Sequence, residues 1–261
     1  MKPPFKYSGG KSREIKNILP LMPKEWNRII EPFAGGAALS FYLEKPAILC
    51  DIRENNIKTF EAVRDNFDSV YEYIQELKTK DTEYLEKEYY RQRDTMFGCK
   101  NSVDIAKRWI TLRQLCFSGM DRINSKTGKF NVPFAWYNKF SCNLSNEHSL
   151  FLKKCELILG DWSIAYNSAK PDDFVFLDPP YLSRNSEYGG EYKDSEDFHI
   201  KISEKFKDVK TKSMIVHIDC DLYRDLYKDF NIIDKNFMYS QNFKGRTNSN
   251  QKVNHLYITN Y

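Results

Sequence analysis

The amino-acid sequence predicts a Rossmann-like α/β fold in which a helical insertion interrupts one sheet domain. Apolar runs that end in a glycine turn or an acid occur in both parts of the chain, for example at 28–33 and 174–178. Helical periods alternate with these runs, as in βαβ units with a parallel sheet. The middle of the chain has helical periods but no convincing strand. We therefore expect residues 1–67 and 151–261 to form the α/β domain and residues 68–150 to form the insertion.

The composition is that of a folded protein outside the membrane. The 261 residues suffice for one large α/β domain, or for a domain with a smaller insertion. Aromatic residues make up 15% of the chain, which argues against disorder. No apolar run approaches the roughly 18–20 residues of a membrane span. The first residues also lack the apolar stretch of a signal peptide, so we expect a cytoplasmic protein with no membrane partner.

The net charge and the spacing of cysteines and histidines bear on whether the protein binds nucleic acid or metal. The net charge of +4 permits nucleic acid as a partner but does not by itself argue for it. None of the six cysteines forms a CxxC pair, and the four histidines form neither HExxH nor HxH. We therefore expect no metal site, and we expect the cysteines to be buried thiols in a reducing compartment.

The first part of the chain is typical of a βαβ unit preceded by a loop. A loop rich in proline and glycine is followed by an amphipathic stretch. A buried strand then stops at a tight glycine turn, and a helix, a strand that ends on an acid and another helix follow. We expect these elements, in this order, at 3–11, 12–21, 28–33, 37–43, 46–51 and 55–67.

The insertion is expected to hold three helices, at 69–79, 82–97 and 102–117, and then a basic, aromatic loop at 118–140. The α/β pattern resumes after it. Strands are expected at 156–159, 174–178, 213–218 and 231–233, and helices at 194–206 and 221–227. Two polar loops complete the pattern, at 183–193 and, between two terminal strands, at 244–252.

The carboxyl ends of the predicted strands carry the residues expected to bind a ligand, because ligands of doubly wound sheets lie there. The glycine pair of Phe33-Ala34-Gly35-Gly36 lets the backbone approach a ligand closely. Asp51 ends the second strand, where a carboxylate suits the two hydroxyls of a ribose. The glycines form no GxGxxG pattern, so a dinucleotide is not indicated. A nucleoside without a pyrophosphate fits better, and S-adenosylmethionine (SAM) is the main candidate.

Asp178-Pro179-Pro180-Tyr181 follows a strand without polar residues and suits methyl transfer to an amino nitrogen. The exocyclic amine of a base is a poor nucleophile because its lone pair is delocalised into the ring. The Asp178 carboxylate and a proline carbonyl can accept both amino hydrogens, which aims the lone pair at the methyl carbon. Tyr181 can stack on the base, and positioning and electrostatics would supply the catalysis. The alternative is a strand followed by a structural Pro-Pro turn.

These motifs and their order resemble those of the Dam-type (D12 class, alpha-ordered) DNA adenine-N6 methyltransferases. The similarity covers nearly the whole chain, and the insertion stands where that family has its target recognition region. The matching segments are Pro4-Phe5-Lys6-Tyr7-Ser8-Gly9-Gly10-Lys11, Glu31-Pro32-Phe33-Ala34-Gly35-Gly36, Asp51-Ile52, Phe117-Ser118-Gly119-Met120-Asp121-Arg122-Ile123-Asn124, Gly128-Lys129-Phe130-Asn131-Val132-Pro133-Phe134 and Asp178-Pro179-Pro180-Tyr181.

The resemblance implies a role for individual residues in binding SAM and adenine. Asp178 matches the residue shared by the cofactor and the target base, with Pro179, Pro180 and Tyr181 beside it in the catalytic motif. Asp51 matches the acid that binds the ribose. The cofactor residues implied in the same way are Tyr7, Lys11, Phe33, Ala34, Gly35, Gly36, Ile52, Asp161 and Trp162.

The resemblance also implies double-stranded DNA as the partner and a set of contacts to it. Arg122 matches the arginine that reads guanine in the major groove, a bidentate pairing. Met120 and Pro133 match positions that touch a thymine methyl, and Lys6 matches a lysine near the first guanine. The other implied contacts are Phe117 and Ser118, which fill the gap left by the extruded adenine, Arg93, which contacts a phosphate, and Asn124.

Departures from the family pattern bear on the recognised sequence more than on the chemistry. Met120, Asp121 and Ala135 stand where the family has Leu, Cys and Gly. GATC is the expected site, and another site that starts with GAT is the alternative. Two other functions stay open: the same chemistry on RNA or protein, and a catalytically inactive DNA-binding relative. A bacterial, phage or viral source is expected, whereas the oligomeric state, monomer or weak dimer, is not predicted.

Overall fold

The computed structural model describes residues 1–95, 101–124, 129–182, 196–238 and 252–261. Within these ranges the chain forms a seven-stranded sheet in the order β3-β2-β1-β4-β5-β7-β6. The strands from β3 to β5 in this order run parallel, and β7 runs antiparallel to both β5 and β6. The predicted α/β fold is therefore confirmed. The strands are β1 (Ile29–Glu31), β2 (Ala47–Asp51), β3 (Cys155–Leu159), β4 (Phe174–Leu177), β5 (Lys212–Ile218), β6 (Asn231–Met238) and β7 (Lys252–Thr259).

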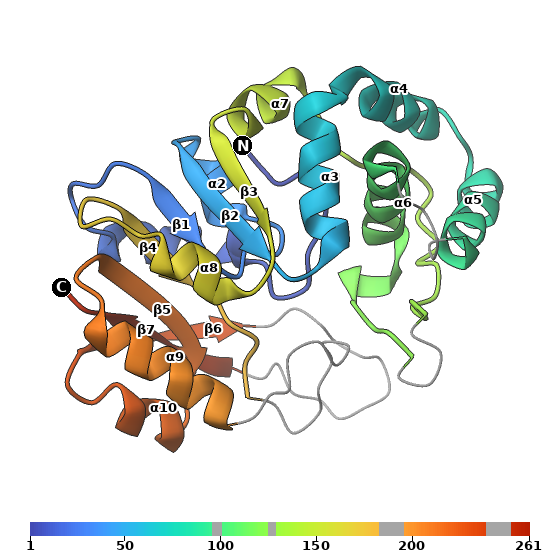
Figure 1. Cartoon of the computed structure of the whole chain (residues 1–261). Coiled ribbons are helices and arrows are strands. Elements are labelled where there is room, and N and C mark those ends of the chain that lie inside the picture. The colour runs from blue at the N-terminus through green and yellow to red at the C-terminus, as the bar shows by residue number, and fades with distance from the viewer. Residues whose placement is uncertain (96–100, 125–128, 183–195, 239–251) are drawn as a thin grey trace.

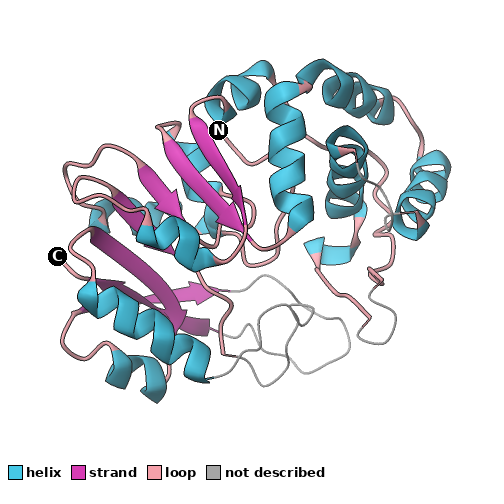
Figure 2. Ribbon diagram, in the orientation of Figure 1, coloured by secondary structure: helices cyan, strands magenta, loops and turns pink. Residues whose placement is uncertain are grey.

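Helices cover both faces of the sheet (Figures 1 and 2). One face packs against three helices from the last part of the chain: α8 (Trp162–Asn167), α9 (Glu196–Asp208) and α10 (Asp221–Leu226). On the side of the other face lie helices from the first part and the middle, which pack on the sheet directly or through a neighbouring helix. These are η1 (Lys11–Arg13), α1 (Ile15–Ile18), η2 (Leu19–Leu21), α2 (Ala38–Leu43), α3 (Glu54–Asp65), α4 (Phe67–Lys78), α5 (Thr82–Asp94), α6 (Ser102–Leu115) and α7 (Asn146–Leu152), with the short η3 (Phe117–Gly119) after α6.

The central strands form because both of their faces are covered. Every residue of β2 and of β4 is buried, and successive side chains enter opposite cores. Ile29 of β1 belongs to the core under α2 and α3, whereas its neighbour Ile30 belongs to the core under α8 and α9. Such strands appear in a sequence as continuous apolar runs, which is why β1, β2 and β4 were predictable.

The strand β6 is longer than the sequence predicts. The apolar run ends at Ile233, yet β6 continues through Asp234, Lys235 and Asn236, which pair with β7 and are exposed. β6 is the outermost strand of the sheet, so these polar side chains remain in water. Edge strands commonly carry charged residues, and an apolar pattern alone does not detect them.

The three helices predicted in the middle of the chain are confirmed as α4, α5 and α6, which lie beside α3 and away from the sheet (Figure 1). Asp81 and Asn101 cap α5 and α6 by accepting hydrogen bonds from the Tyr84 and Val103 amides. The predicted boundary at residue 150 falls inside α7. The insertion thus shares its last helix with the segment that leads into β3.

Some expectations fall outside the described residues: the end of the helix predicted at 82–97, the polar loop at 183–193 and positions 244–251 of the last loop. Among the helices that are described, none has the length and apolar character needed to cross a membrane.

Candidate active site

A pocket lies where the carboxyl ends of β1, β2 and β4 meet. Four segments that are far apart in the sequence line it: 7–11 before η1, 31–38 after β1, 51–53 after β2 and 178–181 after β4, together with Phe176 of β4. Because β1, β2 and β4 are neighbouring parallel strands, their ends must converge at one edge. The structure thus brings the glycine turn, the acid and the Asp-Pro-Pro-Tyr motif into one pocket.

Lys11 and Asp178 form an ion pair in this pocket. The Lys11 ammonium lies 2.6 Å from Oδ1 and 2.7 Å from Oδ2 of Asp178, and it also donates to the Gly9 carbonyl at 3.0 Å. The Lys11 side chain is 4% exposed and that of Asp178 is 19% exposed. Burial raises the pKa of Asp178, and the charge and hydrogen bond of Lys11 counteract that rise. Lys11 is therefore the main group that favours the ionised form of Asp178.

Tyr181 lies over the same ion pair. Its hydroxyl donates to Oδ1 of Asp178 at 3.2 Å, and the Lys11 ammonium lies 5.0 Å from the centre of its ring. Its ring packs at a steep angle on the ring of His255 in β7, with ring centres 5.7 Å apart. Tyr181 is thus oriented by its contacts with Lys11, Asp178 and His255. The sequence predicts a tyrosine near the target base but not this network.

The Asp51 carboxylate accepts three hydrogen bonds from the protein. Oδ2 accepts from the Gly35 amide at 2.7 Å and from the Asn56 side chain at 3.0 Å, and Oδ1 accepts from the Arg53 amide at 2.8 Å. Burial raises the pKa of Asp51, and these donors oppose the rise. A carboxylate has about four acceptor positions. Asp51 therefore keeps about one for a ligand hydroxyl, rather than the two that the sequence suggested.

The glycine pair after β1 leaves room for the Tyr7 side chain as well as for a ligand. Gly35 has a φ of 51°, and a Cβ atom there would lie 2.6 Å from Cε1 of the Tyr7 ring. A Cβ atom on Gly36 would lie 2.9 Å from Cβ of Tyr7. Glycine thus lets the aromatic ring pack directly on the turn, and Tyr7 forms one wall of the pocket.

Asp161 and Trp162 lie in an adjacent hollow instead of this pocket. The hollow is lined by both residues and by Ile52, which lines the first pocket as well. The Asp161 carboxylate caps α8 by accepting from the Ser163 amide at 2.9 Å. Trp162 stacks on Phe33 of the first pocket, with ring centres 5.7 Å apart. Phe33 and Ile52 therefore stand between the two cavities.

The residues predicted to read DNA lie on a hairpin that follows α6. The amide of Asn131 donates to the Arg122 carbonyl at 3.0 Å, and Asn124 donates to the Lys129 carbonyl at 2.8 Å. The exposed Arg122 guanidinium donates to Oδ1 of Asn131 at 2.7 Å. Phe117, in η3, is 40% exposed and donates its amide to the carbonyl of the exposed Pro133 at 3.0 Å.

The remaining predicted DNA contacts are placed as follows. The Lys6 ammonium donates to the Gln114 carbonyl at 3.0 Å, and burial lowers its pKa. Arg93 lies near the end of α5, where its guanidinium pairs with Asp94 at 3.3 Å. Met120 directly follows η3, and Ser118 lies within it.

Sequence reasoning missed several buried charges around the pocket. Glu31 ends β1, is 4% exposed and accepts a hydrogen bond from the Ser40 amide at 2.8 Å; burial raises its pKa to about 7. Arg113, in α6, is fully buried and lies beside Asp121. A charged residue inside an otherwise apolar helical face is the signal that could have identified Arg113. Within the described residues no group of His, Cys, Asp and Glu side chains could hold a metal ion.

An α/β sheet of this order, with a glycine turn, an acid and Asp-Pro-Pro-Tyr in one pocket, defines a methyltransferase that acts on amino groups. A family model described as D12 class N6 adenine-specific DNA methyltransferase matches residues 7–241. The chain therefore belongs to the D12 class of N6 adenine-specific DNA methyltransferases, and the resemblance seen in its motifs is confirmed.

Named relatives agree with this assignment. Type II methyltransferase M.CviBI of Paramecium bursaria Chlorella virus NC1A is 33% identical, with 100% of both chains covered. Type II methyltransferase M1.LlaDCHI of Lactococcus lactis subsp. cremoris is 30% identical over 100% of this chain and 96% of its own. The DNA adenine methylase of Haemophilus influenzae is 29% identical over 71% of this chain and 66% of its own. The protein is thus an adenine-specific DNA methyltransferase.

Proposed function

We propose that the protein transfers a methyl group from SAM to N6 of an adenine that is flipped out of double-stranded DNA, at GATC sites. The observation that carries the proposal is the one pocket that Lys11, Asp51 and Asp178 line from three segments. A base inside a duplex cannot reach such a pocket, so extrusion of the adenine is the physical requirement.

The residues around the pocket fit SAM. Asp51 offers an acceptor position for a ribose hydroxyl, the Gly35 turn permits close approach of a ligand to the backbone, and Phe33 and Ile52 supply apolar walls. Lys11 and Asp178 present opposite charges, which suits the amino and carboxylate groups of a methionine moiety. When bound, SAM supplies an activated methyl group on a sulfonium.

The residues of the chain position the amine that accepts the methyl group. Both oxygens of Asp178 contact Lys11, and Oδ1 also accepts from the Tyr181 hydroxyl, so Oδ2 keeps a further lone pair that can accept a hydrogen of the adenine amine. A proline carbonyl of the motif accepts the other hydrogen. Tyr181 is fixed beside Asp178 by its own hydroxyl. With the amine oriented in this way, positioning and electrostatics lower the barrier without prior removal of a proton from the amine.

Sequence recognition is assigned to the hairpin after α6. The Asn131 side chain holds the Arg122 guanidinium at 2.7 Å, which preorganises the fork that arginine uses for guanine. Met120 and Pro133 lie near it in the sequence and suit contacts with thymine methyl groups. GATC follows from the match of these residues to the family pattern.

The test is methylation of adenine-unmodified plasmid DNA with SAM, read by long-read sequencing that reports N6-methyladenine in context. N6-methyladenine confined to GATC is the expected result. N6-methyladenine in another motif would keep the chemistry and remove the assigned recognition sequence. If the protein binds SAM but the DNA contains no modified adenine, the proposal is contradicted. That result would favour RNA as the substrate or a non-catalytic role.

A further inference from the structure

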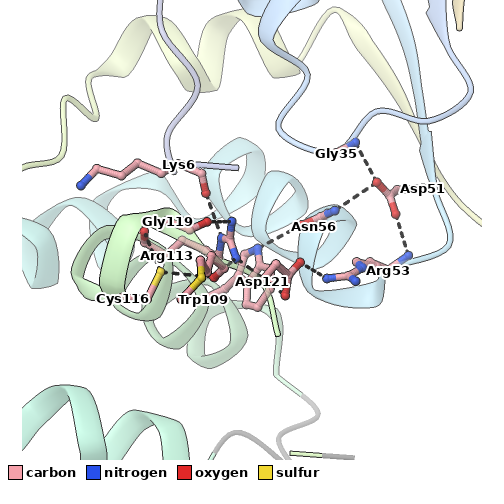
Figure 3. A network of polar contacts seen from close by, with 11 residues as sticks. Lys6, Gly35, Asp51, Arg53, Asn56, Trp109, Arg113, Cys116, Gly119 and Asp121 are labelled. Atoms are coloured by element: carbon pink, nitrogen blue, oxygen red, sulfur yellow. Dashed lines mark hydrogen bonds and ion pairs between the residues drawn. The ribbon is translucent and has the colours of Figure 1, made fainter. Parts of the chain in front are cut away.

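A buried cluster of three charged residues joins the recognition hairpin to the pocket (Figure 3). Asp121 stands between Met120 and Arg122, yet its side chain is only 1% exposed. It pairs with Nη1 of Arg53 and lies 3.7 Å from Nη1 of Arg113. The Arg53 side chain is 12% exposed and that of Arg113 is fully buried. The hairpin therefore begins at a charge that two arginines hold inside the protein.

On the recognition side, Arg113 holds backbone rather than side chains. Its guanidinium donates to the carbonyls of Gly119 at 2.8 Å, Met120 at 3.0 Å and Lys6 at 2.9 Å. Arg113 thus fixes the chain just before Arg122 and just before Tyr7. Since its donors serve these carbonyls, the Asp121 carboxylate depends on Arg53 for its short ion pair.

On the pocket side, Arg53 is part of the wall that binds the ligand. It lines the pocket, and its amide donates to Oδ1 of Asp51 at 2.8 Å. Asn56 strengthens this connection, because its amide nitrogen donates to Asp51 while its amide oxygen accepts from Nε1 of Trp109 at 3.0 Å. A shift of the Asp51 loop would therefore move Arg53, and through it Asp121.

Stability alone does not account for this arrangement. Removing two charges from water is costly, so a buried ion pair stabilises a fold little compared with apolar packing. Among the described residues, none donates a hydrogen bond to Oδ1 of Asp121. A cluster that contributes little to stability, yet connects two binding surfaces by direct contacts, is suited to coupling them.

We propose that Asp121 is a positioning residue for DNA recognition, whose ion pair with Arg53 makes the binding of cofactor and the binding of DNA depend on each other. The inference rests on the function proposed above. A cofactor that orders the Asp51 loop orders Arg53, and Arg53 then holds the segment that carries Arg122. Linkage requires the effect to be reciprocal, so bound DNA must raise cofactor affinity by the same factor.

The experiment measures that factor directly. Calorimetry gives the affinity for S-adenosylhomocysteine, which cannot react, with and without a saturating duplex that contains the methylated site. The affinity for the duplex is then measured with and without S-adenosylhomocysteine. We expect both ratios to agree in the wild type, at about 5- to 100-fold. In Asp121→Asn they should fall to about one, while the affinity for S-adenosylhomocysteine alone stays within about threefold of the wild type.

Two further variants keep the test decisive. Asp65→Asn breaks an exposed ion pair with Arg64 at the end of α3 and should keep the wild-type ratio. The double variant Arg53→Gln with Asp121→Asn removes one charge of each sign, so the net charge of the cluster stays that of the wild type. Arg113 keeps its hydrogen bonds to three carbonyls, and the variant should fold with a ratio near one. A double variant that folds and keeps the wild-type ratio overturns the inference. A wild type that binds both ligands independently overturns it as well, whereas failure to bind either ligand removes the proposed function itself.

Discussion

At the scale of single residues, the pocket depends on contacts that compensate for burial. Asp178 and Asp51 are both acids whose pKa burial raises, and each is held by donors from another segment of the chain. Lys11 does this for Asp178, and the Gly35 amide does it for Asp51. Removing either donor is expected to change binding or chemistry more than folding.

We expect Lys11→Met to lower kcat by about 10- to 100-fold, a loss of about 1.4–2.7 kcal/mol of transition-state stabilisation. Without the ammonium, burial raises the pKa of Asp178 further, so the acid limb of the pH profile of kcat/KM should move to higher pH. Lys16→Met, an exposed lysine of α1, is the matched control. An unchanged acid limb would remove Lys11 from this role.

Gly35→Ala should weaken SAM binding by about tenfold or more. Its φ of 51° costs an L-residue about 1–2 kcal/mol, and the new Cβ would lie 2.6 Å from the Tyr7 ring. Gly160→Ala serves as the control, because a Cβ atom there would contact only the flexible end of the Ile164 side chain. Calorimetric titration with SAM measures the change, and equal affinity in both variants would contradict the role assigned to the turn.

At the scale of elements, hydrogen bonds hold the recognition hairpin in place, whereas aromatic packing holds the helices after β4. The hairpin is held by backbone hydrogen bonds between Arg122 and Asn131 and by the buried Arg113 beneath it. In the second layer, His199 of α9, His217 of β5 and Tyr223 of α10 pack as one aromatic group, with His217 stacked on Tyr223 at 3.8 Å. Tyr223 also accepts a hydrogen bond from the amide of Leu182 at 3.0 Å, just after the catalytic motif.

Arg122→Ala should relax sequence choice and cost about 1–3 kcal/mol of discrimination at one base pair. Arg122→Lys should keep affinity through its charge but lose most of the bidentate selectivity. The measurement is methylation of a library of sites, each one base different from the preferred site. An unchanged preference in Arg122→Ala would exclude this residue from reading the DNA.

The aromatic group predicts that stability falls in mild acid. Burial lowers the pKa of His199 to about 4 and that of His217 well below 6.5, and neither nitrogen of the His217 ring has a hydrogen-bond partner in the part of the chain that the structure describes. As the pH falls, these histidines take up protons in the unfolded chain at a higher pH than in the folded protein. The free energy of unfolding should therefore fall between pH 6.5 and 4. Each such histidine contributes up to about 1.4 kcal/mol per pH unit.

The matched variant is His217→Phe, which keeps a ring against Tyr223 but does not titrate. Its free energy of unfolding should depend less steeply on pH than that of the wild type in this window. Urea titrations at pH 7, 6 and 5 give the two slopes. Equal slopes would show that protonation of His217 is not what destabilises the protein in acid.

At the scale of the whole molecule, the sequence predicts what periodicity and motif order determine. The buried runs that became β1, β2 and β4 are readable because they are covered on both faces, and three of the four pocket segments follow from the ends of those strands. Contacts between distant segments leave no such pattern. The ion pair of Arg53 with Asp121 joins residues that are 68 positions apart, and the polar edge of β6 depends on pairing with β7.

The same long-range packing leads to the last prediction, that the chain unfolds as one unit although its sequence suggests an inserted domain. One continuous core contains Leu49 of β2, Phe174 of β4, Leu77 of α4 and Trp109 of α6. Calorimetry should therefore give a single transition with equal calorimetric and van't Hoff enthalpies. A fragment of residues 68–150 loses the apolar surface that α3 and the sheet cover and should not fold alone. Two resolved transitions, or a fragment that folds cooperatively, would show that the insertion is an independent domain.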